Sequence, residues 1–101
     1  MPRSSDDSSR TNRGSVVMTA RLRVIGGKGY DAIITDISPT GCSIAMPGIQ
    51  LRPDQRVAIQ PETLEYLLGI VKSSGEATAI IEFDRPLYGP VVDHLKRRFA
   101  R

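Results

Sequence analysis

Hydrophobic and polar residues alternate along most of the chain from Val16 onward, and this period of two is typical of β-strands that bury one face. In the first segment Met18, Ala20, Leu22 and Val24 share one face, and the residues between them are polar. Turns rich in Gly, Pro or Ser separate this segment from five more of the same kind. The later strands are predicted at residues 30–38, 42–45, 56–60, 64–72 and 76–84.

In two of these segments the alternation places particular apolar residues on one face of the strand. In the second segment we expect Ala32 and Ile34 to lie on one face, opposite Ile33, Thr35 and Ile37. In the fifth segment the apolar residues two positions apart are expected to share a face. That face consists of Leu64, Tyr66, Leu68 and Ile70.

After Pro86 the apolar residues recur three or four positions apart, which predicts a short amphipathic helix at about residues 89–100. Six short strands joined by frequent turns predict an all-β fold, either an antiparallel barrel or a sandwich. Closure into a barrel would remove the exposed edges of so small a sheet. We expect the helix to cover an open end or face of that barrel. Its apolar residues are Val91, Val92, Leu95 and Phe99.

The first fourteen residues contain no Leu, Ile, Val or aromatic residue, so they cannot bury enough apolar surface to offset the entropy of ordering. We therefore expect residues 1–14 to form a flexible arm and residues 15–101 to form one barrel domain, which suits a chain of 101 residues. The net charge of +3 is too small to indicate a phosphate-bearing partner by itself. The Lys and Arg residues gather toward the two ends of the sequence.

Several classes of function find no support in the residue types present. A single cysteine, Cys42, cannot form an internal disulfide, and with a lone histidine, His94, it does not make a zinc site. We expect no catalytic residues, no bound metal and no cofactor. No apolar run approaches the roughly 18 residues of a membrane span, and the polar start of the chain is not that of a secretory signal. These features predict a protein of the reducing cytoplasm.

The most informative stretch is Asp36-x-Ser38-x-x-Gly41, at the end of the second predicted strand. Residues two apart in a strand point to the same side, so a carboxylate and a hydroxyl would lie together there. Such a pair can exchange hydrogen bonds with the edge of one planar ligand. The alternative is that Asp36 and Ser38 cap their own turn, as these residue types often do, and the spacing alone favours that alternative.

The order of features along the chain resembles the PilZ domain family. An arginine-bearing arm precedes the first strand, D-x-S-x-x-G lies between the second and third strands, and a barrel with a C-terminal helix follows. The resemblance covers about residues 10–99 and extends to Glu82-Phe83-Asp84 and the Pro-Leu that follows. It implies a six-stranded antiparallel PilZ-like β-barrel with a C-terminal helix. PilZ domains are bacterial receptors for the second messenger cyclic-di-GMP.

The family pairs D-x-S-x-x-G with R-x-x-x-R in the N-terminal arm. Asp36, Ser38 and Gly41 match the first of these motifs completely. In the arm, Arg10 and Arg13 form R-x-x-R, which is one residue shorter than the family spacing. The two arginines can take the places of the family's pair only if the backbone of the arm adapts to this shorter spacing. The resemblance implies that the two arginines clamp phosphate and guanine, that Asp36 and Ser38 bind a guanine edge, and that Gly41 allows close approach.

The expected function is therefore cyclic-di-GMP sensing in second-messenger signalling, with the bound state acting on a partner protein that the sequence does not identify. The shortened arm motif leaves open a PilZ-fold interaction module that does not bind the nucleotide. A small nucleic-acid-binding barrel is the third possibility. The aromatic content of 5%, with no Trp, argues against it because single-strand binders usually offer aromatic stacking platforms.

Overall fold

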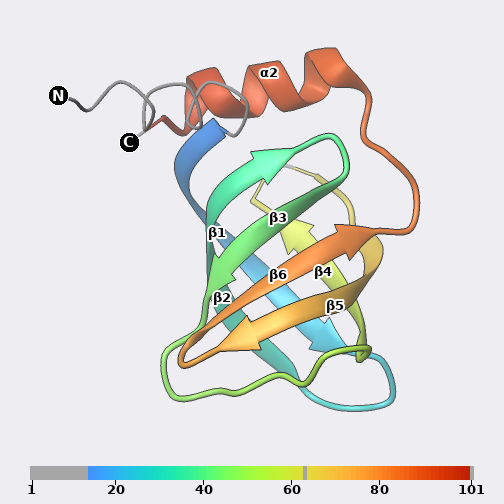
Figure 1. The fold of residues 1–101 in the computed structure, drawn as a ribbon. Helices are drawn as coiled ribbons and strands as arrows, with labels where there is room; N and C mark the ends of the chain where they lie inside the picture. The colour runs from blue at the N-terminus through green and yellow to red at the C-terminus, as the bar shows by residue number, and fades with distance from the viewer. Residues whose placement is uncertain (1–13, 63, 101) are drawn as a thin grey trace, which may run out of the picture.

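The computed structural model describes residues 14–62 and 64–100 and shows a closed barrel with one helix across its end (Figure 1). The strand order is β1-β2-β3-β6-β5-β4, all neighbours are antiparallel, and pairing of β1 with β4 closes the barrel. The predicted six-stranded barrel and C-terminal helix are both confirmed. The elements are β1 (Gly14–Val24), β2 (Gly29–Ser38), β3 (Gly41–Ala45), β4 (Arg56–Pro61), β5 (Leu67–Gly75), β6 (Thr78–Phe83) and α2 (Gly89–Arg98).

Aliphatic side chains from every strand fill the inside of the barrel. The alternation predicted for the first strand is confirmed, because Met18, Ala20 and Leu22 are buried and the residues between them are exposed. Ala79, Ile81 and Phe83 of β6 are buried in the same way. No polar or charged side chain is buried among the described residues, so the core of this part of the chain is entirely apolar. Burial of these apolar side chains stabilises the folded chain through the hydrophobic effect.

The inward and outward alternation of β2 changes phase at Thr35, contrary to the prediction. Between Ile34 and Asp36 the pairing with β3 shifts by one residue, so β2 contains a β-bulge there. Ile37 is consequently buried with Ala32 and Ile34, whereas the prediction placed it on the opposite face. A strict period of two cannot detect an inserted residue, and the prediction was wrong for this reason.

The predicted boundaries of the fifth strand, residues 64–72, were also wrong. β5 begins at Leu67, and its inward positions are Gly69 and Val71. Leu68 and Ile70, expected to share a face, do so, and that face is the outer one, since Leu68 has 50% of its surface exposed; Tyr66, with 46% exposed, precedes the strand. Apolar residues occupy both faces of this segment, so periodicity could not choose between them, and the pairing with β4 and β6 decides the orientation.

Helix α2 lies across one end of the barrel and is attached at both of its ends (Figure 1). The backbone N–H of Val17 in β1 donates to the carbonyl oxygen of Phe99 at 3.0 Å. Before the helix, the N–H of Leu87 donates to the carbonyl oxygen of Pro39 in the β2–β3 turn at 2.7 Å. Val92 and Leu95 are buried against the barrel. Within the described ranges, no helix has the length and apolar character needed to cross a membrane.

Replacing Leu95 by alanine should lower the free energy of unfolding by about 2–5 kcal/mol, because Leu95 is fully buried between α2 and the barrel. Urea unfolding followed by circular dichroism measures this change. The adjacent exposed residue supplies the control, since His94→Ala should change stability by no more than about 0.5 kcal/mol. Equal effects of the two substitutions would contradict the packing of α2 described above.

A bidentate ion pair joins β4 to the end of β6. Arg56 donates to the two carboxylate oxygens of Asp84 at 2.9 and 2.6 Å, and the guanidinium holds the pKa of Asp84 below its ordinary value. A lowered pKa in the folded state stabilises the fold above the unfolded pKa of about 3.9, and that contribution is lost as the pH falls through the folded pKa.

Asp84→Asn should therefore lower the midpoint of thermal unfolding modestly at pH 7, and the difference from the wild type should vanish at pH values below the folded pKa of Asp84. Thermal melts between pH 7 and pH 2 test this. Asp93→Asn, at an exposed position of α2, serves as the comparison. A difference that stays constant over the whole pH range would mean that the ion pair is not its source.

Candidate functional site

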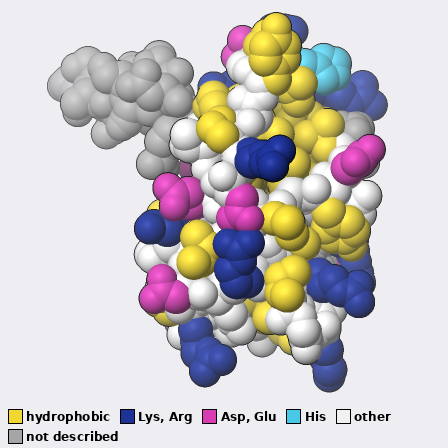
Figure 2. Space-filling model, turned by 90° about the vertical axis from the view of Figure 1, so that its right-hand side faces the viewer, with side chains coloured by type: hydrophobic (Ala, Val, Ile, Leu, Met, Phe, Trp, Pro, Cys, Tyr) yellow, Lys and Arg dark blue, Asp and Glu magenta, His cyan; other side chains and the backbone are white. Residues whose placement is uncertain are grey.

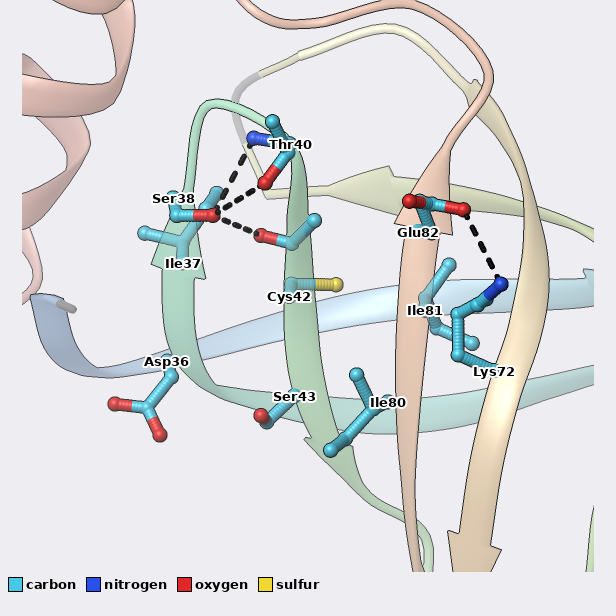
Figure 3. Close-up of a pocket in the computed structure, with 11 residues that line it drawn as sticks. Asp36, Ile37, Ser38, Thr40, Cys42, Ser43, Lys72, Ile80, Ile81 and Glu82 are labelled. Carbon is cyan, nitrogen blue, oxygen red and sulfur yellow. Dashed lines mark hydrogen bonds and ion pairs between the residues drawn. The ribbon is translucent and has the colours of Figure 1, made fainter.

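An open pocket of about 250 Å³ lies on the outer face of the barrel where β2, β3 and β6 are adjacent (Figure 3). The D-x-S-x-x-G segment forms one side, and residues of β5 and β6 form the other. The structure thus brings the three predicted residues of this motif to one pocket. The lining residues are Asp36, Ile37, Ser38, Thr40, Gly41, Cys42, Ser43, Lys72, Ile80, Ile81 and Glu82.

Asp36 and Ser38 both lie on the outside of the barrel because Ile37, between them, is buried. This orientation depends on the bulge at Thr35. With strict alternation after Ile34, which is buried, Asp36 and Ser38 would point into the apolar core. Burial of an ionised carboxylate there would be very costly, so the bulge and the polar pair belong together.

Ser38 makes only long hydrogen bonds within its own turn. Its hydroxyl accepts from the N–H of Thr40 at 3.3 Å, donates to the carbonyl oxygen of Gly41 at 3.4 Å, and lies 3.3 Å from the Thr40 hydroxyl. Strong hydroxyl hydrogen bonds are 2.5–3.0 Å long, so these contacts are weak. The turn-capping role weighed from the sequence is thus present for Ser38, and it leaves a hydroxyl that a ligand can compete for.

Asp36 accepts a hydrogen bond of 3.5 Å from the hydroxyl of Ser15, its cross-strand neighbour in β1. The same register places Gly14, the first residue of β1, opposite Ile37. The start of β1 therefore runs beside the motif. β1 begins one residue before the predicted boundary of the barrel, and the remainder of the predicted arm, with Arg10 and Arg13, lies outside the described residues.

Gly41 has a structural reason to be glycine that does not involve a ligand. It pairs with Glu82 of β6, and a Cβ at this position would collide with the backbone carbonyl oxygen of Ile81. Backbone atoms in a barrel cannot move aside as a flexible side chain can. Gly41 therefore allows β3 and β6 to approach closely beneath the pocket.

Cys42 is an apolar part of the core and not a reactive group. Its side chain is buried, and this burial raises the pKa of the thiol to about 12, so the thiol stays protonated at neutral pH. Among the described residues, no group of three or more His, Cys, Asp or Glu side chains is arranged to hold a metal ion.

Lys72 and Ile80 also line the pocket, and neither was a candidate site residue in the sequence analysis. The ammonium of Lys72 lies 3.7 Å from a carboxylate oxygen of Glu82, and both side chains are 55% exposed, so this ion pair is weak. Ile80 is an exposed apolar residue of β6. Lys72 is the residue inserted in the β5 bulge, which periodicity does not show, and Ile80 stands at an outward position of β6 that the alternation treats as polar, so sequence reasoning missed both.

Neither a protein-family model nor a curated protein matches the sequence. The structure is similar to the crystal structure of the PilZ domain of CeSA from a cellulose-synthesizing bacterium, with a TM-score of 0.59. The match has 15% sequence identity and covers 85% of this chain and 91% of that chain. This chain has a PilZ-like fold. In this PilZ-like barrel the Asp36-x-Ser38-x-x-Gly41 segment spans the β2–β3 turn and lines the pocket.

Gly41→Ala should destabilise the PilZ-like barrel by about 1–3 kcal/mol in the absence of any ligand, because the added methyl group meets backbone that cannot yield. Urea unfolding measures the loss. Gly89→Ala is the matched control: a Cβ there has open space and the backbone φ is ordinary, so stability should be nearly unchanged. A Gly41→Ala variant as stable as the wild type would overturn the structural role of this glycine.

Proposed function

We propose that this chain is a non-catalytic receptor that binds cyclic-di-GMP at the outer face of the barrel and presents the bound state to a partner protein. The observation that carries the proposal is the placement of Asp36 and Ser38. They lie next to each other on the outside of a PilZ-like barrel, in one open pocket, within a complete D-x-S-x-x-G motif.

The chemistry of guanine suits these two side chains. An ionised carboxylate only accepts hydrogen bonds, and the Watson–Crick edge of guanine offers two adjacent N–H donors, at N1 and at the exocyclic amino group. Asp36 would accept from this edge. The Ser38 hydroxyl can donate as well as accept, so it can bind a ring nitrogen or the O6 carbonyl of the same base. Guanine is thus favoured over bases that present an acceptor at the corresponding position.

The size of the pocket limits how much of the ligand it can hold. Pockets that enclose a whole drug-sized ligand measure about 300–1,000 Å³, and this one measures about 250 Å³. It suits one base, with the phosphates and the remaining nucleotide lying over the outer surface. A ligand bound in this way needs a second element of the protein to contact its charged side.

The arm can supply that element because it is attached beside the pocket. Arg13 directly precedes Gly14, which pairs with Ile37, and Arg10 lies three residues earlier. A guanidinium group can bind two phosphate oxygens at once, bind guanine O6 and N7, or stack on a base. Held by the ligand against the barrel, the arm would form a new surface for the partner to recognise.

The two alternatives to the receptor proposal are an interaction module and a nucleic-acid-binding barrel. The R-x-x-R spacing is consistent with an interaction module of the same fold that binds no cyclic-di-GMP. For a nucleic-acid-binding barrel we would expect a continuous basic surface. On the face drawn in Figure 2, Lys and Arg side chains are interspersed with Asp, Glu and hydrophobic side chains, and the described part of that face has no basic stripe.

Isothermal titration of the full chain with cyclic-di-GMP tests the proposal. Asp36→Ala and Arg13→Ala should each weaken binding by roughly ten- to a hundredfold, because each removes a charged hydrogen-bonding partner of the ligand. Asp93→Ala on α2 and Arg23→Ala at the far end of β1 are the matched controls and should leave the affinity unchanged.

No binding by the wild-type chain at millimolar ligand would refute the receptor proposal and favour the interaction module. Binding that is unaffected by both Asp36→Ala and Arg13→Ala would refute the assignment of the site. Salt-dependent binding of random oligonucleotides, with no preference for cyclic-di-GMP, would instead support the nucleic-acid-binding barrel.

A further inference from the structure

A second hollow of about 340 Å³ adjoins the pocket on the outer face of the barrel. The two hollows share Ser43 and Ile80, so together they form one groove across β2, β3, β6 and β5. A row of paired residues crosses the strands where the two hollows meet: Asp36 is opposite Ser43, Ser43 is opposite Ile80, and Ile80 is opposite Ser73. The candidate guanine site is therefore one end of a longer surface feature.

Two β-bulges shape the sides of this groove. In β2 the residue inserted relative to β3 is Thr35, and in β5 the residue inserted relative to β6 is Lys72. On both strands the bulge makes two consecutive residues point away from the core, Thr35 with Asp36 and Lys72 with Ser73. Bulges are frequent next to functional sites because they redirect side chains.

Where the two hollows meet, the groove has one exposed apolar side chain with polar side chains around it. Ile80 is 48% exposed, although it lies among the hydroxyl groups of Ser43, Ser73 and Thr78. The exposed side chain of Ile80 offers an apolar contact for the face of a ring. The neighbouring hydroxyl groups can form hydrogen bonds with the polar edge of that ring. Figure 3 shows Lys72 and Ile80 on the side of the pocket opposite Asp36.

We propose that the second guanine of the same cyclic-di-GMP molecule lies on Ile80, and that Lys72 binds a phosphate of that molecule. This inference rests on the proposed function and adds to it the far half of the ligand site. Lys72 is suited to this role because its ion pair with Glu82 is long and exposed, so a doubly charged ligand can replace it. A phosphate within reach of an ammonium is a charge-assisted contact.

The spacing of the strands sets the shape of the bound ligand. Asp36 and Ile80 lie two strands apart, a distance of roughly 10 Å. Two bases stacked directly on each other cannot occupy both positions. One molecule that occupies both positions has its two bases apart, and the inference then predicts one ligand per chain.

Isothermal titration with cyclic-di-GMP tests the inference on the full chain. Ile80→Ala should weaken binding about fivefold through the lost apolar contact, and Lys72→Gln about tenfold through the lost charge. Leu68→Ala is the matched control for the first, because Leu68 is equally exposed on β5 but outside the two hollows. Lys28→Gln, in the β1–β2 turn, is the control for the second, and neither control should change the affinity.

Methyl NMR of isoleucine-labelled protein gives a readout that a purely structural role would not move. A base lying on Ile80 should shift its methyl signals upfield through the ring current, while Ile25, exposed at the other end of the barrel, stays in place. If cyclic-di-GMP binds in an Asp36-dependent manner but the Ile80 signals and the affinities of both variants are unchanged, this inference fails and the proposed function stands. If the wild-type chain does not bind cyclic-di-GMP, both fail.

Discussion

An inserted residue in β2 determines which way the candidate site faces. Ala32 and Ile34 point into the barrel, and continued alternation would send Asp36 inward as well. The bulge at Thr35 reverses the phase, so Ile37 enters the core and the carboxylate and hydroxyl on either side of it reach the surface. The large cost of burying an unpaired carboxylate and the gain from burying Ile37 both favour this arrangement. The proposed binding surface depends on that one change of phase.

A second β-bulge lies on the other side of the β3–β6 pair, in β5, where the inserted residue Lys72 follows the buried Val71. Close packing between the two bulged strands comes from glycine. Added Cβ atoms at Gly41 and Gly69 would meet the backbone carbonyls of Ile81 and Glu82, so both glycines let β6 lie tightly between its neighbours. The close approach of β3, β6 and β5 on this side of the barrel therefore depends on these two glycines.

The orientation of the side chains could be predicted from the sequence where the alternation is uninterrupted, but not where a residue is inserted. β1, β6 and α2 could be predicted because their buried apolar residues recur at one period: Met18, Ala20 and Leu22 in β1, Ala79, Ile81 and Phe83 in β6, and Val92 and Leu95 in α2. The motif residues Asp36 and Ser38 were located as well, since their types and spacing are visible in the chain. The reason that they face outward was not visible, because a bulge is defined by pairing between strands distant in the sequence.

The same limit explains why Lys72 and Ile80 were missed. The fifth strand was predicted at residues 64–72, and the pattern did not show the bulge that leaves Lys72 and Ser73 both exposed. In β6 the alternation treats the position of Ile80 as polar, although an exposed isoleucine occupies it. The pairing of β5 with both β4 and β6 determines which residues of β5 face inward. This orientation therefore depends on the whole barrel and not on the periodicity of one segment.

A crystal structure of the full chain grown with cyclic-di-GMP would test the central claim most directly. It should show a guanine edge within hydrogen-bond distance of the Asp36 carboxylate and the Ser38 hydroxyl, on the outer face of the barrel. A messenger molecule bound elsewhere on the chain, with these two side chains untouched, would contradict the claim.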